Sequence, residues 1–261
     1  MPTKIDWCDE VWNPVTGCTK ISPGCDHCYA ERMAKRLAGR CGYLKNNPFK
    51  ITLHPERLSI PLRWRKPRRI FVNSMGDLFH EQVATQWVDD VLEVIAACPH
   101  HTFMILTKRP KNIDEKLYGI KATHGCRVLG GGDYLPNLWL GVTVENQMMA
   151  DQRIPVLLRV PAAKRFVSIE PMLGPVEIPH LVRPYHRLPF SYPHWIDWVI
   201  CGGETGPGAR PMMSEWVESL RDQCVDAGVP FFFKGWGTAL RPKDATYQLI
   251  EGREWKQFPE K

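Results

Sequence analysis

The chain has 261 residues, of which 44% are hydrophobic, and a formal net charge of +6. This length and composition are sufficient for one large domain with a buried core. No apolar run reaches transmembrane length, and residues 1–6 lack the apolar stretch of a signal peptide. The sequence therefore excludes a membrane-spanning protein, and we expect a cytoplasmic protein with no membrane partner.

Three cysteines, Cys18, Cys25 and Cys28, lie close together after the first expected strand, Val11–Val15. Prolines and glycines break any regular structure between them, so the C-x6-C-x2-C spacing predicts a turn-rich loop. Such a loop can place three thiolates around one point, as a metal ion or an iron–sulfur cluster requires. Three protein ligands leave a coordination position open for a reactant. We therefore predict a chemically active metal or cluster site.

Six further cysteines need another explanation, because the cytoplasm disfavours structural disulfides. Cys98 and Cys224 fall on apolar helical faces, and Cys201 ends an apolar strand. We expect these three to be small buried hydrophobic residues. The other three have no assigned role: Cys8, Cys41 and Cys126.

Positive charge is concentrated between Lys20 and Arg69, where thirteen Lys and Arg residues stand against three Asp and Glu. The densest part, residues 63–69, reads Arg-Trp-Arg-Lys-Pro-Arg-Arg. Basic residues around an aromatic ring suit phosphate contact and base stacking, and a solvated loop is an equally strong interpretation. The stretch 40–69 thus predicts a nucleic acid or nucleotide as partner or substrate.

Helical spacing of apolar residues predicts a helix from about Cys28 to Gly39. After the basic stretch, short apolar strands alternate with helices. The expected strands are 69–73, 102–106, 138–142, 165–169, 195–200 and 229–233. The expected helices are 84–96, a short one ending near 118, 146–158 and 213–224. A glycine-rich connection is expected at 130–132.

This alternation favours a parallel sheet covered by helices. About seven strand candidates suit an α/β fold of the complete or partial (βα) TIM-barrel type. A doubly wound sheet is the alternative, but no G-x-G-x-x-G phosphate loop follows the first strand. We expect a single barrel domain over residues 1–237, with a basic insertion at about 40–69 and a polar C-terminal tail over 238–261.

Polar side chains cluster where the expected strands stop, which is where parallel α/β folds bind ligands. They are Asp77, Lys108, Arg109, Glu145, Ser168, Glu170, Glu204 and Lys234. Any single carboxylate among them is more often solvated or a helix-capping residue. Their recurrence at strand ends favours a site. Lys108 and Arg109 are expected to bind an anionic group, with an exposed loop pair as the alternative.

Seven segments together carry a family resemblance. They are 12–28 with the three cysteines, 73–79 (Asn-Ser-Met-Gly-Asp-Leu-Phe), 106–110 (Leu-Thr-Lys-Arg-Pro), 140–146 (Leu-Gly-Val-Thr-Val-Glu-Asn), 168–171 (Ser-Ile-Glu-Pro), 202–204 (Gly-Gly-Glu) and 231–237 (Phe-Phe-Phe-Lys-Gly-Trp-Gly). As a set, they resemble a phage-associated family of three-cysteine-motif proteins, classed as a domain of unknown function. That family looks like an outlying branch of the radical S-adenosylmethionine (SAM) superfamily, and the resemblance covers nearly all of the chain except the tail.

The resemblance implies a [4Fe–4S] cluster held by Cys18, Cys25 and Cys28, with SAM on the fourth iron. An electron donor would drive reductive cleavage of SAM to methionine and a 5′-deoxyadenosyl radical, which abstracts a hydrogen atom from an unidentified substrate. The spacing departs from the superfamily's usual C-x3-C-x2-C, and His27 stands where an aromatic residue is common. Here the cofactors carry the chemistry, while the protein binds and orients.

The resemblance also implies roles for strand-end residues. Gly76 and Asp77 would hold the methionine amino group, and Glu145 or Asn146 the ribose. Two further cofactor-binding candidates are Ser168 and Glu170. The candidates for contact with the substrate are Lys108, Arg109, Glu204 and Lys234.

Zinc is the alternative to the cluster. Cys8, His27 or Cys41 would supply a fourth ligand and close a tetrahedral site. The protein would then be a zinc-stabilised nucleic-acid-binding protein without redox chemistry. A third interpretation is a partner subunit whose cluster only transfers electrons. We favour the radical-SAM-type enzyme because of the barrel-like context of the cysteines.

Overall fold

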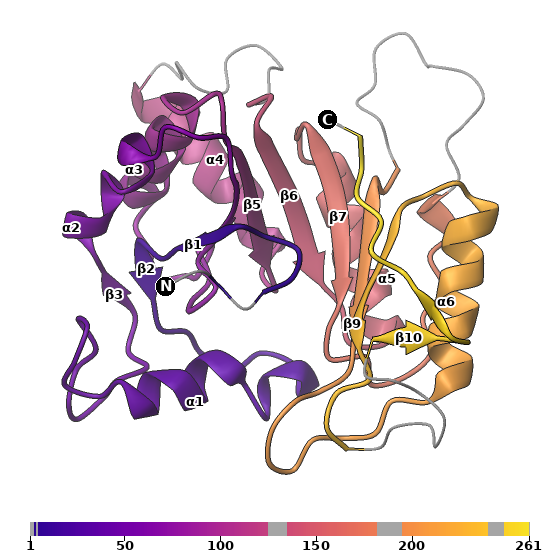
Figure 1. Cartoon of the computed structure of the whole chain (residues 1–261). Coiled ribbons are helices and arrows are strands. Elements are labelled where there is room, and N and C mark those ends of the chain that lie inside the picture. The colour runs from indigo at the N-terminus through magenta and orange to yellow at the C-terminus, as the bar shows by residue number, and fades with distance from the viewer. Residues whose placement is uncertain (1–2, 4, 125–134, 182–194, 240–247, 261) are drawn as a thin grey trace, which may run out of the picture. The chain divides into compact units, whose positions relative to one another are not determined.

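The computed structural model describes residues 3, 5–124, 135–181, 195–239 and 248–260. Its main sheet has seven strands in the order β1-β4-β5-β6-β7-β8-β9 (Figure 1). Their bounds are β1 Glu10–Trp12, β4 Arg69–Val72, β5 Thr102–Thr107, β6 Leu138–Thr143, β7 Lys164–Ile169, β8 Trp198–Gly202 and β9 Phe231–Gly235. The register is parallel for β1 with β4, β4 with β5, β7 with β8 and β8 with β9.

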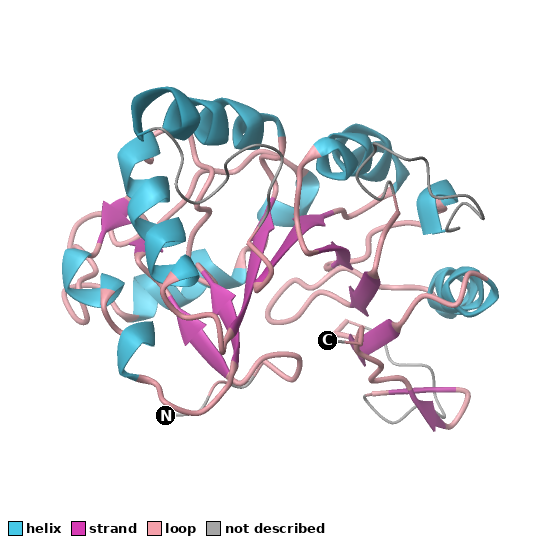
Figure 2. Cartoon of the chain, turned by 90° about the horizontal axis from the view of Figure 1, so that it is seen from above, coloured by secondary structure: helices cyan, strands magenta, loops and turns pink. Residues whose placement is uncertain are grey.

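Helices alternate with these strands along the chain. Figure 2 distinguishes the helices and the strands by colour. In the described part of the chain, β1 and β9 are the two edges of the sheet, so the barrel-type sheet is partial rather than complete. The predicted α/β fold class is confirmed. None of the described helices is long and apolar enough to cross a membrane. The predicted glycine-rich connection at 130–132 and Cys126 lie outside the described residues.

The chain divides into two compact units, each with its own part of the sheet. The first unit comprises Met1–Lys20, Cys28–Leu140 and Val160–Ala163, and carries β1, β4, β5 and the beginning of β6. Its helices are α1 Tyr29–Arg36, α2 Pro55–Leu58, α3 Thr85–Ala96 and α4 Lys111–His124. The last of these continues past the predicted end near 118.

The basic stretch 40–69 is tied into the first unit. Its strand β3 (Thr52–Leu53) pairs antiparallel with β2 (Val15–Thr16), just before the cysteines. The indole of Trp12 donates to the carbonyl oxygen of Arg57 at 2.8 Å. The insertion therefore supports the segment that leads into the three cysteines.

The second unit comprises Ile21–His27, Gly141–Arg159 and Lys164–Lys261. It carries the end of β6 with β7, β8 and β9, and the helices α5 Gln147–Arg159 and α6 Ser214–Asp226. The predicted tail contributes the hairpin of β10 Leu249–Ile250 and β11 Arg253–Glu254. Trp255 is buried, and Trp198 donates to the carbonyl oxygen of Gln257 at 2.9 Å. The described part of the tail is thus packed against the unit.

Strands β6 and β8 are buried along their whole length, as continuous apolar runs in a parallel sheet require. The packing is tight at Gly141 in β6. A Cβ atom there would lie 2.5 Å from the ring of Phe166 in β7. Glycine is therefore needed for the ring to pack against the neighbouring strand.

Replacing Gly141 with alanine should destabilise the protein by roughly 1–3 kcal/mol, because the buried Phe166 ring must move. Gly174→Ala is the control, since a Cβ there meets only Asn146 at an ordinary 3.7 Å. The free energy of unfolding in urea measures both variants. Equal stability of the two would contradict this account of the packing.

Candidate functional site

The cysteine loop, residues 17–28, runs from the end of β2 to α1. Cys18, Cys25 and Cys28 form no disulfide and are partly exposed. Cys25 ends a short 3-10 turn that begins at Pro23, and Cys28 stands at the N-cap position of α1. The three side chains are thus available as soft metal ligands.

Contacts divide this loop between the two units. Cys18 and Cys28 belong to the first unit, and Cys25 belongs to the second. Among the residues that the structure describes, no three or more His, Cys, Asp or Glu side chains are grouped so as to hold a metal ion. A shared cluster on the three cysteines therefore stays a prediction, and so does a fourth ligand from Cys8, His27 or Cys41.

The start of the loop is packed too closely for a side chain at position 17. Gly17 has a φ of +87°, and a Cβ there would lie 2.2 Å from the carbonyl oxygen of Lys50. Its N–H donates to the carbonyl oxygen of Met75 at 2.9 Å. A Cβ at Gly76, a predicted cofactor residue, would approach the carbonyl oxygen of Gly17 to 3.0 Å. The two glycines together fix the chain that leads into Cys18.

Arg109 follows β5 and has a side chain that is only 3% exposed. Its Nη1 donates to Cys18 Sγ at 3.2 Å, and its Nη2 donates to the carbonyl oxygen and Oγ1 of Thr19 at 2.9 and 2.8 Å. Nε donates to the Glu81 carboxylate at 3.0 Å. Burial alone would lower the pKa of Arg109, but the charges of Cys18, Asp77 and Glu81 raise it. Arg109 is thus a buried cation rather than an exposed loop residue.

Asp77, predicted to bind the methionine part of SAM, is buried and occupied by protein donors. Its Oδ1 accepts from the Phe79 N–H at 3.1 Å and from Thr107 Oγ1 at 2.7 Å. Its Oδ2 accepts from the Lys108 N–H at 3.1 Å and lies 3.5 Å from Arg109 Nη1. A carboxylate offers about four acceptor positions. These contacts favour a role for Asp77 in joining the ends of β4 and β5.

Glu145 follows β6 and is fully buried. Its Oε1 accepts from Ser22 Oγ at 2.6 Å, and its Oε2 accepts from Arg153 Nη1 at 3.1 Å. A Cβ at Gly24 would lie 2.3 Å from Glu145 Cγ, so only glycine fits at that point of the loop. Asn146, the next residue, accepts from the Met149 N–H at 3.1 Å and caps α5.

Glu204 follows β8 and holds the loop from another side. Its carboxylate accepts from the backbone N–H and the guanidinium of Arg210 at 2.5–2.9 Å, and from His27 Nδ1 at 2.9 Å. Arg210 in turn donates to the Pro23 carbonyl oxygen at 2.9 Å and approaches Asp26 at 3.4 Å. Burial alone would raise the pKa of Glu204, but these hydrogen bonds lower it to about 2.

The remaining predicted residues make fewer contacts with the loop. Lys234 Nζ donates to Glu170 Oε1 at 2.6 Å, and both side chains are about a quarter exposed. Ser168 is buried within β7. Lys108 is partly exposed, and its backbone N–H donates to Asp77. The pair of Lys234 and Glu170 is therefore the strand-end pair best placed to meet a ligand within the second unit.

Sequence reasoning missed the partners of these carboxylates. Arg153 and Arg210 were not predicted, although Arg153 closes a buried ion pair with Glu145 and the partly exposed Arg210 pairs with the buried Glu204. The signal for Arg153 was present, because it lies in the buried stripe of α5 with Met149 and Ile154. A charged residue within an apolar stripe needs a buried partner. Nothing in the local sequence marked Arg210.

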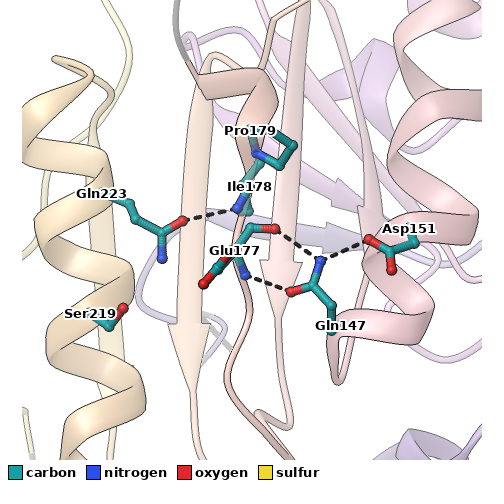
Figure 3. A pocket seen from close by; sticks show the side chains of 7 residues that line it. All are labelled: Gln147, Asp151, Glu177, Ile178, Pro179, Ser219 and Gln223. Atoms are coloured by element: carbon teal, nitrogen blue, oxygen red, sulfur yellow. Dashed lines mark hydrogen bonds between the residues drawn. The ribbon is translucent and has the colours of Figure 1, made fainter.

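The second unit also has a polar cavity of about 410 Å³ between α5, α6 and the segment Glu177–Pro179 (Figure 3). The amides of Gln147 and Gln223 hydrogen-bond to the backbone of residues 176–178. No predicted site residue lines this cavity. The cavity therefore gives no support to the predicted site.

Because the folded-state pKa of Glu204 lies below its usual 4.5, its contribution to stability is present above pH 4.5 and is lost as the pH falls toward 2. Glu204→Gln should lower the free energy of unfolding at pH 7 by roughly 1–3 kcal/mol, and this difference should shrink toward pH 2. Urea unfolding at several pH values measures it. The exposed Glu215→Gln is the control, and a difference that does not change with pH would contradict the ion-pair account.

Comparison with known proteins gives one structural neighbour and one family. No curated protein matches the chain. The structure is similar to that of a mutant of spore photoproduct lyase, with a TM-score of 0.52 and 11% sequence identity over 91% of this chain and 79% of that chain. At this identity the similarity supports the fold, the partial TIM-type barrel. A family model matches residues 2–259, and the chain therefore belongs to the family described as a protein of unknown function, DUF5131.

Proposed function

We propose that this protein is a radical-SAM-type iron–sulfur enzyme. One observation carries the proposal: a loop with three partly exposed cysteines outside any disulfide follows the first strands, and buried charged side chains hydrogen-bond to it at Cys18, Ser22 and His27. The fold resembles that of a lyase named for its action on the spore photoproduct. The sequence motifs resemble an outlying branch of the radical SAM superfamily.

The chemistry of the donor set, three cysteine sulfurs, suits the proposed cluster. Cys18, Cys25 and Cys28 would hold it, and thiolates are the usual ligands of iron–sulfur clusters. Arg109 Nη1 donates to Cys18 Sγ at 3.2 Å, so one ligand already has a cation beside it. When bound, the cluster with SAM would supply one electron to the sulfonium and abstraction of a hydrogen atom from the substrate.

The chain's own residues would bind and orient. Glu145 hydrogen-bonds to Ser22, which precedes Cys25, and Glu204 hydrogen-bonds to His27, which follows it. These contacts fix the loop on both sides of Cys25. The pair of Lys234 and Glu170 can exchange its partly exposed hydrogen bond for one to a polar substrate. The residues at the strand ends thus have two roles: some support the cysteine loop, and others contact the ligand.

The proposed substrate class is a nucleic acid or nucleotide, recognised by the basic stretch. Arg68 and Arg69 are paired with Glu10 and Asp9, so they contribute less net positive charge than the sequence suggested. Arg63, Arg65 and Lys66 are exposed around Trp64. The Trp64 ring is half-buried, and the Arg68 guanidinium lies over it at 5.4 Å from the ring centroid. The proposal therefore rests on the three exposed cations, which suit contact with a phosphate backbone.

Anaerobically purified protein should be brown, contain iron and sulfide in near-equal amounts, and release 5′-deoxyadenosine from SAM when given a one-electron reductant such as dithionite. Cys25→Ala should abolish colour and product. Cys98→Ala should keep both, because Cys98 is a buried thiol outside the loop. Absorption spectra, iron analysis and chromatography measure these outcomes.

Two outcomes would contradict the proposal. A colourless protein with stoichiometric zinc would instead identify the closed zinc site, and a brown protein inert toward SAM would identify an electron-transfer subunit.

Replacing Arg63, Arg65 and Lys66 together by glutamine should weaken binding of a labelled single-stranded oligonucleotide and reduce the salt slope of log K by about 2. A triple variant with the same charge change at exposed Lys111, Arg159 and Arg253 is the control. Fluorescence polarisation at several salt concentrations gives both slopes. Equal effects of the two triple variants would show that only net charge matters, and would remove the basic stretch as a specific binding surface.

A further inference from the structure

We propose that Arg109 is a positioning residue for Cys18 and raises the reduction potential of the cluster bound there, an inference that rests on the proposed function. The sequence indicated an anion-binding role for Arg109 at the mouth of the barrel. The contacts of its guanidinium point to the loop instead.

The donor capacity of Arg109 is fully used within the first unit. A guanidinium has five N–H donors and cannot act as an acceptor. The structure supplies five acceptors: the carboxylates of Glu81 and Asp77, Cys18 Sγ, and the carbonyl oxygen and Oγ1 of Thr19. With its side chain 3% exposed, Arg109 has no N–H left for a substrate anion. It therefore acts through the loop and not on the substrate.

Hydrogen bonds anchor two consecutive residues of the loop, Cys18 and Thr19. Arg109 donates twice to Thr19, and Thr19 Oγ1 also lies 2.9 Å from His80 Nε2. The preceding amide, that of Cys18, donates to the carbonyl oxygen of Phe49 at 3.3 Å. Because the planar guanidinium makes these contacts from one fixed fork, it fixes the direction of the Cys18 side chain.

The electrostatic effect follows from the 3.2 Å contact between Arg109 Nη1 and Cys18 Sγ. Hydrogen bonds to the sulfurs are among the factors that set the potential of an iron–sulfur cluster. A donor with positive charge stabilises the added electron of the reduced form. Asp77 lies 3.5 Å from the same nitrogen and Glu81 lies 3.0 Å from Nε, and both carboxylates offset the charge, so the hydrogen bond to sulfur carries most of the effect.

Two substitutions separate charge from geometry. Arg109→Gln removes both the charge and the fork, whereas Arg109→Lys keeps a charge opposite Asp77 and protects the fold. Arg221→Gln is the control, because Arg221 is also a largely buried arginine with two carboxylate partners, Asp222 and Glu251, on α6 and the hairpin.

The first measurement needs no cluster. In the metal-free protein, hydrogen exchange of the amides at residues 17–20 should be at least about tenfold faster in Arg109→Gln than in the wild type, and unchanged in Arg221→Gln. Unchanged exchange in both Arg109 variants would overturn the anchoring role. This arm decides the positioning claim even for a protein that binds no iron.

The second measurement is the midpoint potential of the reconstituted cluster, followed by electron paramagnetic resonance during a redox titration. Arg109→Gln should lower the midpoint potential, so that at a fixed applied potential the ratio of oxidised to reduced cluster rises at least about tenfold. For one electron, this ratio corresponds to a shift of about 59 mV. Arg109→Lys should give a smaller shift in the same direction. Iron-loaded variants with the wild-type potential would overturn the tuning role and leave the proposed function standing. A wild type that takes up no iron would overturn the proposed function and, with it, the tuning role.

Discussion

The structure depends on one constraint: ionised side chains buried at the ends of the strands must find partners, and several of them find these partners on the cysteine loop. A buried charge without a partner is strongly destabilising, whereas a buried pair with full hydrogen bonding is tolerated. Arg109 is satisfied by Cys18 and Thr19 together with Asp77 and Glu81. The loop therefore supplies partners for buried charges at the strand ends. Rearranging the loop would leave these charges without partners and would destabilise the fold.

The same constraint changes how the strand-end carboxylates are interpreted. Glu145 and Glu204 are buried, and their oxygens accept hydrogen bonds from Ser22, Arg153, His27 and Arg210. Buried carboxylates that are held by protein donors on both oxygens are poor candidates for direct contact with a cofactor. Their value to a reaction would lie in holding the loop rigid, since reactive groups must be supported by residues that are themselves fixed. The partly exposed Lys234 and Glu170 remain the candidates for ligand contact.

Much of the fold could be predicted from the sequence. The runs at 138–143 and 198–202 are apolar at nearly every position, and such runs form strands covered on both faces. The site was only partly predictable, because ion pairs depend on where side chains meet across many residues of sequence. Arg210 links Glu204 to the carbonyl oxygen of Pro23 by hydrogen bonds. The sequence around each of these residues gives no sign of this contact. Arg153 had a signal, a charge in an apolar helical stripe, that was not used.

The central claim is that Cys18, Cys25 and Cys28 hold one iron–sulfur cluster together. Anomalous diffraction at the iron edge from crystals of anaerobically reconstituted protein tests it most directly. The account predicts a compact group of iron peaks bounded by the three Sγ atoms, with one iron lacking a protein ligand. A single zinc peak with four protein ligands, or iron distant from these sulfurs, would contradict it.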